Sequence, residues 1–178
     1  DIQRVFIFIG AMSFLYHALH KWYGLFLHKE YGLDNGAVST ILVIVALCGL
    51  TGQQIGGYLS DKKGRLASCY AGMAALALGA MLLAGHYPVY AVAGVLGLGS
   101  MGWTISHNSV STILTDFPDG DRPVIASLNS AVRFITGGLG FLLSKFFVER
   151  SFGMTFLGIG VLFFIMILGI NSVFKKQV

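Results

Sequence analysis

An arginine lies deep inside an apolar stretch of this sequence, where a charged side chain is expected to have a function. Arg133 follows about ten residues after the start of an apolar run near residues 124–147. If that run is a helix, about 1.5 Å per residue places Arg133 roughly 15 Å along it, near the middle of a bilayer. We expect it to bind an anionic substrate or to pair with an acid. No carboxylate lies inside an apolar run, so that acid would come from outside this chain. The alternative is that Arg133 lies nearer the membrane surface and extends to water.

Three further side chains that can carry or exchange protons recur at helical spacing near the start of the sequence. His17, His20 and Lys21 are three and four residues apart, which places them on one face of a helix. Histidine changes charge near neutral pH, so we expect this group to relay protons or to recognise a substrate. Trp22 and Tyr23 would line the outer mouth of that pathway. The alternative is a belt at the membrane surface, where lysine, tryptophan and tyrosine are at home.

A second polar pair, His107 and Asn108, interrupts another apolar run and is a weaker candidate for the same pathway. In a helical bundle such a pair more often makes hydrogen bonds between helices. Haem would need axial ligands placed across a bundle, and His17 and His20 share one face too closely to serve two haems. We therefore expect no cofactor. We find no nucleophile–base group and no metal-ligand spacing in the sequence, so we expect neither an enzyme nor a metal site.

The composition explains why these polar residues stand out. Hydrophobic residues make up 55% of the 178 residues and charged residues only 11%, whereas soluble domains carry about a quarter charged residues. A soluble fold of this size has too much surface to hide so much apolar area, so the solvent must be lipid. The net charge of +4 does not indicate nucleic acid, because the basic residues stand mainly at the ends of apolar runs. Cys48 and Cys69 lie within such runs and are expected to be buried thiols.

Six apolar stretches are long enough to cross a membrane as helices, which needs about 20 residues each. We predict an all-α membrane protein whose single domain, residues 1–178, comprises two three-helix repeats of about 1–86 and 87–178. Polar residues concentrate in the first helix of each repeat, which predicts that first helices face a cavity and third helices face lipid. The predicted spans cover roughly residues 5–27, 37–59, 66–84, 89–114, 124–147 and 154–174.

Six spans place both termini on one side of the membrane, and the basic residues favour one orientation. By the positive-inside rule, the termini and the junction between the second and third spans face the cytoplasm of a cell membrane. That side holds Arg4, Lys62, Lys63, Arg65, Arg122, Lys175 and Lys176, and the other side holds only Lys29, Lys145 and Arg150.

The junction between the second and third spans carries a distinctive motif. Residues 57–65 read Gly-Tyr-Leu-Ser-Asp-Lys-Lys-Gly-Arg. They resemble the signature loop of the major facilitator superfamily, in which glycine, aspartate, a basic residue, a second glycine and further basic residues follow in order. The resemblance covers the whole chain through the six spans, the position of the loop, the acid that closes the fourth span and the glycine-rich fifth span. Leu66 departs from the pattern, and the matching residues are Gly57, Asp61, Lys62, Gly64 and Arg65.

The resemblance implies one six-helix half of a secondary transporter that works by alternating access, with the motif acting as a gate between halves. Asp61 would face the amino end of a helix in the other half, where the helix dipole favours a carboxylate. Arg65 would reach an acid at the end of the fourth span. Asp116 is the first candidate for that acid, and Asp119 and Asp121 are alternatives.

The glycines have two interpretations. A plain topology signal needs only the basic residues, whereas Gly57 and Gly64 weaken a helix and indicate close backbone approach and a tight turn. Two further stripes of small residues follow one face of the second span and one face of the fifth. Each stripe is expected either to contact the other half or to pack against a helix within this bundle. The stripes are Gly49, Gly52 and Gly56, and Gly137, Gly140 and Ser144.

Two features favour a carboxy-terminal half. Antiporters of this family often carry glycine–proline in the fifth span of the first half, but residues 137–141 contain no proline, and the chain ends soon after the sixth span. The expected partners are the lipid bilayer, a small-molecule substrate and a second six-helix half in the same polypeptide, a separate chain or a homodimer. Proton coupling is expected from the histidines. The alternative function is a structural or assembly subunit of a larger membrane complex that reuses this fold.

Overall fold

Helices make up the regular secondary structure of the described residues. The structure is a computed structural model and describes residues 2–114 and 122–174. Six helical segments there are long and apolar enough to cross a membrane, the first of them formed by α1 and α2 together. The prediction of an all-α protein with six spans is therefore confirmed. The helices are α1 (Ile2–His20), α2 (Tyr23–Tyr31), α3 (Asn35–Lys63), α4 (Arg65–Leu82), α5 (Val89–Leu114), α6 (Arg122–Val148) and α7 (Phe152–Phe174).

Two boundaries differ from the prediction. The first span is interrupted by a turn at Lys21 and Trp22, between α1 and α2. The motif at residues 57–65 is not a loop, because only Gly64 separates the end of α3 from the start of α4. This glycine has a φ of 92°, a conformation that side chains with a Cβ rarely adopt. The two helices therefore turn about a single residue.

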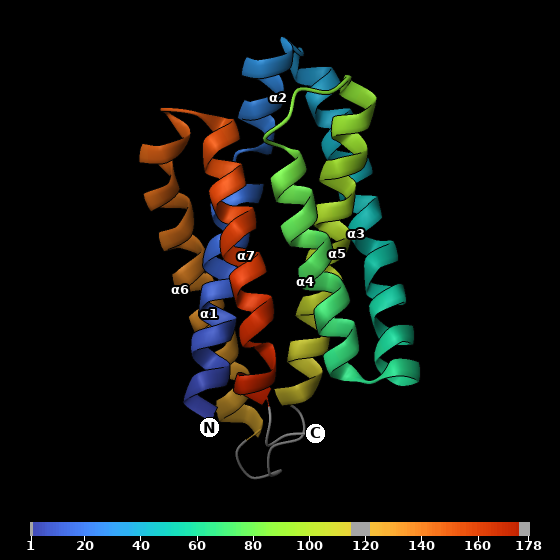
Figure 1. Ribbon diagram of the computed structural model, residues 1–178, viewed down its shortest axis with the longest axis vertical. Coiled ribbons are helices and arrows are strands. Elements are labelled where there is room, and N and C mark those ends of the chain that lie inside the picture. The colour runs from blue at the N-terminus through green and yellow to red at the C-terminus, as the bar shows by residue number, and fades with distance from the viewer. Residues whose placement is uncertain (1, 115–121, 175–178) are drawn as a thin grey trace.

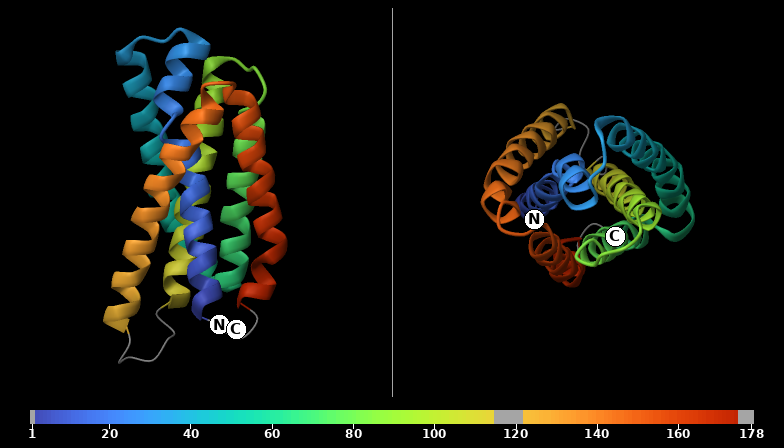
Figure 2. Two further views of the ribbon diagram at one scale, coloured as in Figure 1. Left: turned by 90° about the vertical axis from the view of Figure 1, so that its left-hand side faces the viewer. Right: turned by 90° about the horizontal axis from the view of Figure 1, so that it is seen from above.

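The helices form an upright bundle whose two ends carry different elements (Figure 1). The start of α1, the α3–α4 junction and the end of α7 lie together at one end, which we call the junction end. The opposite end carries α2 and the α6–α7 turn, and we call it the α2 end (Figure 2). A chain that crosses a membrane an even number of times must begin its first span and end its last span on the same side.

The main helix contacts join helices of one predicted repeat to helices of the other. α5 packs against α3 and α4, α1 packs against α6 and α7, and α4 contacts α7. The first helix of each repeat thus packs on the second and third helices of the other repeat. Two similar three-helix units related by a twofold axis would make such contacts, so the pattern supports the predicted division near residue 86. The division stays a prediction, and the two units interlock rather than form separate lobes.

The spans differ strongly in how much of their surface the chain itself covers. In the first span 61% of the most apolar stretch is buried by the chain itself. The corresponding share is 28% for α7 but 44% for α4, the same as for α5. By this measure α6, also at 28%, is covered no better than α7, and the expectation that third helices face lipid stays a prediction. The least covered span is α3, at 17%.

Close helix contacts depend on small residues. A Cβ atom on Gly52 would lie 2.8 Å from Cα of Met101, and one on Gly102 would lie 2.7 Å from the carbonyl oxygen of Gly72. Cβ atoms do not approach other atoms so closely, so α3 and α4 reach the backbone of α5 only because these side chains are absent. Gly140 lies against the backbone of α1 in the same way. The stripes of small residues on the second and fifth spans therefore pack within this bundle.

Gly102→Ala is expected to destabilise the protein by about 1–3 kcal/mol, because the added methyl group overpacks the α4–α5 contact. Gly94→Ala on the same helix is the matched control, since a Cβ there meets nothing within 4 Å. That control should be neutral or stabilising by up to about 1 kcal/mol through helix propensity. Thermal unfolding in mild detergent measures both, and equal midpoints would contradict the role assigned to Gly102.

Candidate functional site

The guanidinium of Arg133 is held inside the bundle, between α6 and α5. The residue is only 8% exposed. Its Nε donates to Oδ1 of Asn129 at 2.7 Å, one turn earlier on α6, and its Nη2 donates to Oγ of Ser111 on α5 at 3.3 Å. Nη1 is buried without a hydrogen-bond partner. The described residues also offer Arg133 no acidic partner, since the ion pair found among them joins Lys145 and Glu149. One nitrogen is thus held within α6 and a second by α5, while the third keeps unused donors.

α1 crosses α6 beside Arg133 and brings a histidine to the same region. Oγ of Ser13 donates to the main-chain carbonyl of Arg133 at 2.8 Å, in a buried contact between the two helices. Nδ1 of His17 lies 2.8 Å from the carbonyl oxygen of Ser13. A carbonyl can only accept, so Nδ1 carries the hydrogen and a neutral His17 keeps a lone pair on Nε2. The ring fits against α6 because position 137 is glycine, where a Cβ would lie 2.8 Å from Nδ1.

A row of rings fills the space between α1 and α5. Tyr16 and Trp103 stack with their centroids 3.9 Å apart and their planes within 5°. His20 stacks on the tyrosine at 5.0 Å, and His107 packs on the tryptophan at 5.3 Å. His17 meets the tryptophan edge-on at 5.8 Å. α1 and α5 have little backbone contact, so side chains close the space between them. We call these five residues the seam cluster.

Lys21 lies in the turn after α1, within electrostatic range of His17 and His20 but outside the row of rings. Lys21 is exposed. The indole N–H of Trp22 donates to Oγ of Ser144 at 2.8 Å, and Tyr23 is 1% exposed. Tyr23 is packed inside the bundle and Trp22 is half-buried beside α6. Their place at an outer mouth or in a belt at the membrane surface stays a prediction.

The two polar residues of α5, His107 and Asn108, make different contacts. His107 belongs to the seam cluster and lies within electrostatic range of Arg133. Asn108 turns towards α3, where its Nδ2 donates to the main-chain carbonyl of Gln53 at 3.4 Å. That contact is the hydrogen bond between helices that was predicted as the alternative. The residues gathered along the seam are Arg133, His17, His20 and His107, whereas Lys21 and Asn108 lie outside it.

The charged residues of the motif lie at the junction end. Asp61 and Lys62 are exposed in the last turn of α3, and Arg65 begins α4 with a half-buried side chain. Asp116, the acid expected to meet Arg65, lies outside the described residues, as do Asp119 and Asp121. The proposed contact between the arginine and the end of the fourth span therefore stays a prediction.

The two motif glycines behave differently. Gly64 forms the predicted tight turn, and its N–H donates to the carbonyl of Ser60 at 3.1 Å to close α3. A Cβ on Gly57 would meet nothing within 4 Å, so the close approach predicted there is not made by the described part of this chain. Its neighbour Gly56 makes such an approach instead, with a Cβ 3.0 Å from Cα of Ile105.

Several supporting residues were missed by sequence reasoning. Ser13 and Asn129 each stand four residues before the side chain they contact, so helical spacing could have found them. Nothing along the sequence relates Tyr16 to Trp103 or Arg133 to Ser111, because these contacts depend on how the helices pack. Within residues 2–114 and 122–174, no three His, Cys, Asp or Glu side chains gather into a potential metal site.

The sequence is similar to known proteins along nearly its whole length. The family model described as Major Facilitator Superfamily matches residues 4–177. A curated protein, Multidrug transporter DTR1 of Candida glabrata, is 27% identical to the chain over 169 residues. The match covers 83% of this chain and 31% of that relative, so the chain spans less than a third of its length.

Gly64→Ala is expected to strain the α3–α4 junction by about 1–2 kcal/mol, because an alanine there would keep a positive φ. Gly57→Ala in the same motif is the control, since it adds a methyl group to an open position on a helix. The control should be neutral or stabilising by up to about 1 kcal/mol. Thermal unfolding of the purified protein compares the two, and a Gly57→Ala variant that unfolds as early as Gly64→Ala would refute the assignment.

Proposed function

Because the chain belongs to the major facilitator superfamily, we propose that it is one six-helix half of a secondary active transporter that moves a small solute by alternating access. In this mechanism two halves rock about a site between them and expose it to one side of the membrane at a time. The reciprocal packing of two three-helix units and the polar seam near the middle of the bundle support the proposal. The relative described as a multidrug transporter is consistent with an organic solute.

The observation that carries the proposal is the unpartnered Nη1 of Arg133. A charged side chain inside a membrane is costly and is retained where it has a function. Asn129 and Ser111 fix the guanidinium, and its remaining donors have no acceptor among the described residues. A carboxylate or phosphate of the solute would supply that acceptor with a charge-assisted hydrogen bond. We therefore propose that the solute carries an anionic group that binds Arg133.

The seam cluster offers a route by which a proton accompanies this anion. His17 has its Nδ1 committed to Ser13, which leaves Nε2 to take up a proton. His107 stands one helical turn before Ser111, the α5 residue that binds Arg133, so an anion bound to the arginine would lie near this histidine and offset a positive charge there. Anion and proton would then favour each other's binding, which is the coupling that a proton-driven transporter requires.

A second six-helix half is the proposed partner, whether in the same polypeptide, in a separate chain or in a second copy. The poorly covered face of α3 and the open position at Gly57 support contact with another half near the motif. Asp61 and Arg65 would take part in the gate at this end. We also propose that the junction end faces the cytoplasm of a cell membrane, because most basic residues outside the spans lie there.

Arg133→Gln is expected to lower uptake of an anionic solute by about 10- to 100-fold, as losing hydrogen bonds to a charge costs about 1.5–3 kcal/mol. The full-length protein would be reconstituted into liposomes with an imposed pH gradient. Radiolabelled benzoate and phosphate serve as anionic probes, and tetraphenylphosphonium serves as the cationic one. Arg133→Lys should retain part of the activity, because it keeps the charge.

Lys145→Gln is the control for this experiment, since that lysine is exposed and pairs with Glu149 at 3.7 Å. Its uptake should equal that of the unmodified protein. Unchanged uptake of both anionic probes in Arg133→Gln, or an equal loss of the cationic probe, would contradict the anionic assignment. Absence of transport by a protein that purifies only within a much larger assembly would favour the structural subunit.

Asp61→Asn is expected to slow transport without changing stability, because the side chain is exposed and would act only against the other half. Interaction of a carboxylate with a helix amino end contributes about 0.3–2 kcal/mol, so the rate should fall roughly two- to thirtyfold. Glu30→Gln, an exposed acid at the α2 end, is the control. Equal rates for both variants in the same liposome assay would remove Asp61 from the gate.

A further inference from the structure

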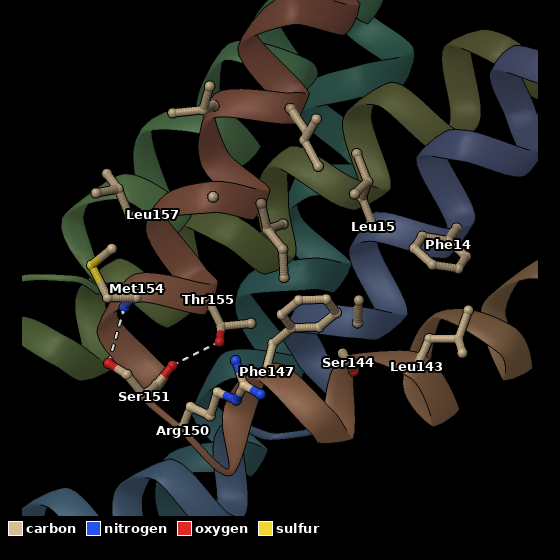
Figure 3. Close-up of a pocket in the computed structure, with 15 residues that line it drawn as sticks. Phe14, Leu15, Leu143, Ser144, Phe147, Arg150, Ser151, Met154, Thr155 and Leu157 are labelled. Atoms are coloured by element: carbon tan, nitrogen blue, oxygen red, sulfur yellow. Dashed lines mark hydrogen bonds between the residues drawn. The ribbon is translucent and has the colours of Figure 1, made fainter.

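An apolar groove lies on the outer side of the bundle, away from the seam cluster. It has a volume of about 720 Å³ and is bounded by α1, α6 and α7 (Figure 3). α6 and α7 touch only sparsely along their length, so the groove opens between them, and Phe14, Leu15 and Ala18 of α1 form its floor. Its walls include Phe147 and Leu162, which are 63% and 48% exposed. In a membrane this opening faces the acyl chains.

The groove has the depth of one leaflet. Along α7 its lining runs from the residues just before the helix to Leu162. The 11 residue steps from Ser151 to Leu162 span roughly 16 Å at about 1.5 Å each. The hydrocarbon core of a bilayer is about 30 Å thick, so one leaflet is about half of that. A single acyl chain lying along α7 from the membrane surface to the midplane would therefore fill it.

The polar side chains of the groove gather mainly at its α2 end. Arg150 lies there beside Phe147, together with Ser151 and Thr155, whereas the deeper lining is apolar (Figure 3). The described residues provide no acid for the Arg150 guanidinium, because the neighbouring Glu149 pairs with Lys145 at 3.7 Å. A positive charge without a counter-ion among the described residues thus stands at the mouth of the apolar channel.

A second source of positive potential lies at the same place. α7, a helix of 23 residues, begins at Phe152, immediately after Arg150 and Ser151. Oγ of Ser151 accepts from the N–H of Met154 at 3.2 Å, and its carbonyl accepts from Oγ1 of Thr155 at 2.7 Å. The helix dipole at this end favours a negative group. The guanidinium and the helix amino end together complement a phosphate.

From these features we propose that the groove binds a bilayer phospholipid with an anionic headgroup. The acyl chain lies between α6 and α7 on the floor formed by α1, and the phosphate lies at Arg150 and the amino end of α7. The lipid belongs to the leaflet at the α2 end. Neither a helix of another protein nor a polar solute would match this combination of an apolar channel one leaflet deep with a cationic mouth.

The test measures lipid retention by the full-length protein in mild detergent by native mass spectrometry. Dioleoyl phosphatidylglycerol is the anionic probe, and dioleoyl phosphatidylcholine is its zwitterionic counterpart. The unmodified protein should retain one phosphatidylglycerol in preference to phosphatidylcholine. Arg150→Gln should reduce that preference about fivefold, the effect of one cation near a membrane surface. Arg150→Lys should keep most of it. Lys29→Gln should leave it unchanged, because that lysine is exposed at the same end and does not line the groove.

The acyl-chain part of the site is tested separately. Gly158 lines the groove and a Cβ there meets nothing within 4 Å, so Gly158→Phe should fill the channel without disturbing the helix contacts. This variant should lose retention of both lipids. Gly169→Phe is the matched control, because position 169 is about three turns further along the same face of α7, is equally open and does not line the groove.

Thermal unfolding of each variant shows that it is folded before lipids are counted. Loss of both lipids in Gly158→Phe but not in Gly169→Phe, with weaker preference in Arg150→Gln, would establish the site. Retention by Gly158→Phe equal to that of the unmodified protein would overturn it. So would an unchanged preference in Arg150→Gln, or retention of detergent alone at this groove.

Discussion

The close approach of α5 to two other helices sets the positions of the remaining elements. In lipid there is little hydrophobic drive between helices, so contact depends on backbones that can come near each other. Gly52 on α3, Gly72 on α4 and Gly102 on α5 leave no room for a side chain where these helices meet. One side of α5 is occupied by those contacts. Trp103 and Ser111 are thereby directed towards α1 and α6, where the candidate site forms.

α1 packs centrally against α6 and α7, as α5 does against α3 and α4. Gly140 and the glycine at position 137 let it lie directly on α6, and Ser13 fixes the crossing by its bond to the carbonyl of Arg133. The two central helices meet mainly through the stack of Tyr16 on Trp103 rather than through their backbones. Side chains can rearrange more readily than packed backbones. The seam between α1 and α5 is therefore the part of this half best suited to open around a solute.

α1 also connects the proposed transport site to the proposed lipid site. Tyr16 and His17 face the seam, while Phe14, Leu15 and Ala18 of the same helical turns form the floor of the groove. An acyl chain held there would press on the helix that carries the histidines. Ser144 lines the groove and accepts the indole N–H of Trp22, in the turn between α1 and α2. The lipid environment could thus bias the position of the α1–α2 turn.

The sequence by itself determined the solvent, the number of spans and the family, because hydropathy over about 20 residues and a short charged motif are local properties. It also singled out Arg133, since a charge in an apolar run is visible without a fold. Tertiary structure decided what local patterns leave open. It turned the motif loop into a single-residue turn at Gly64 and assigned the glycine stripes to internal packing. It also turned Asn108 towards α3, placed Lys21 in an exposed turn and created the groove at Arg150. These outcomes depend on which helix faces meet, and that is fixed by contacts between residues far apart in the chain.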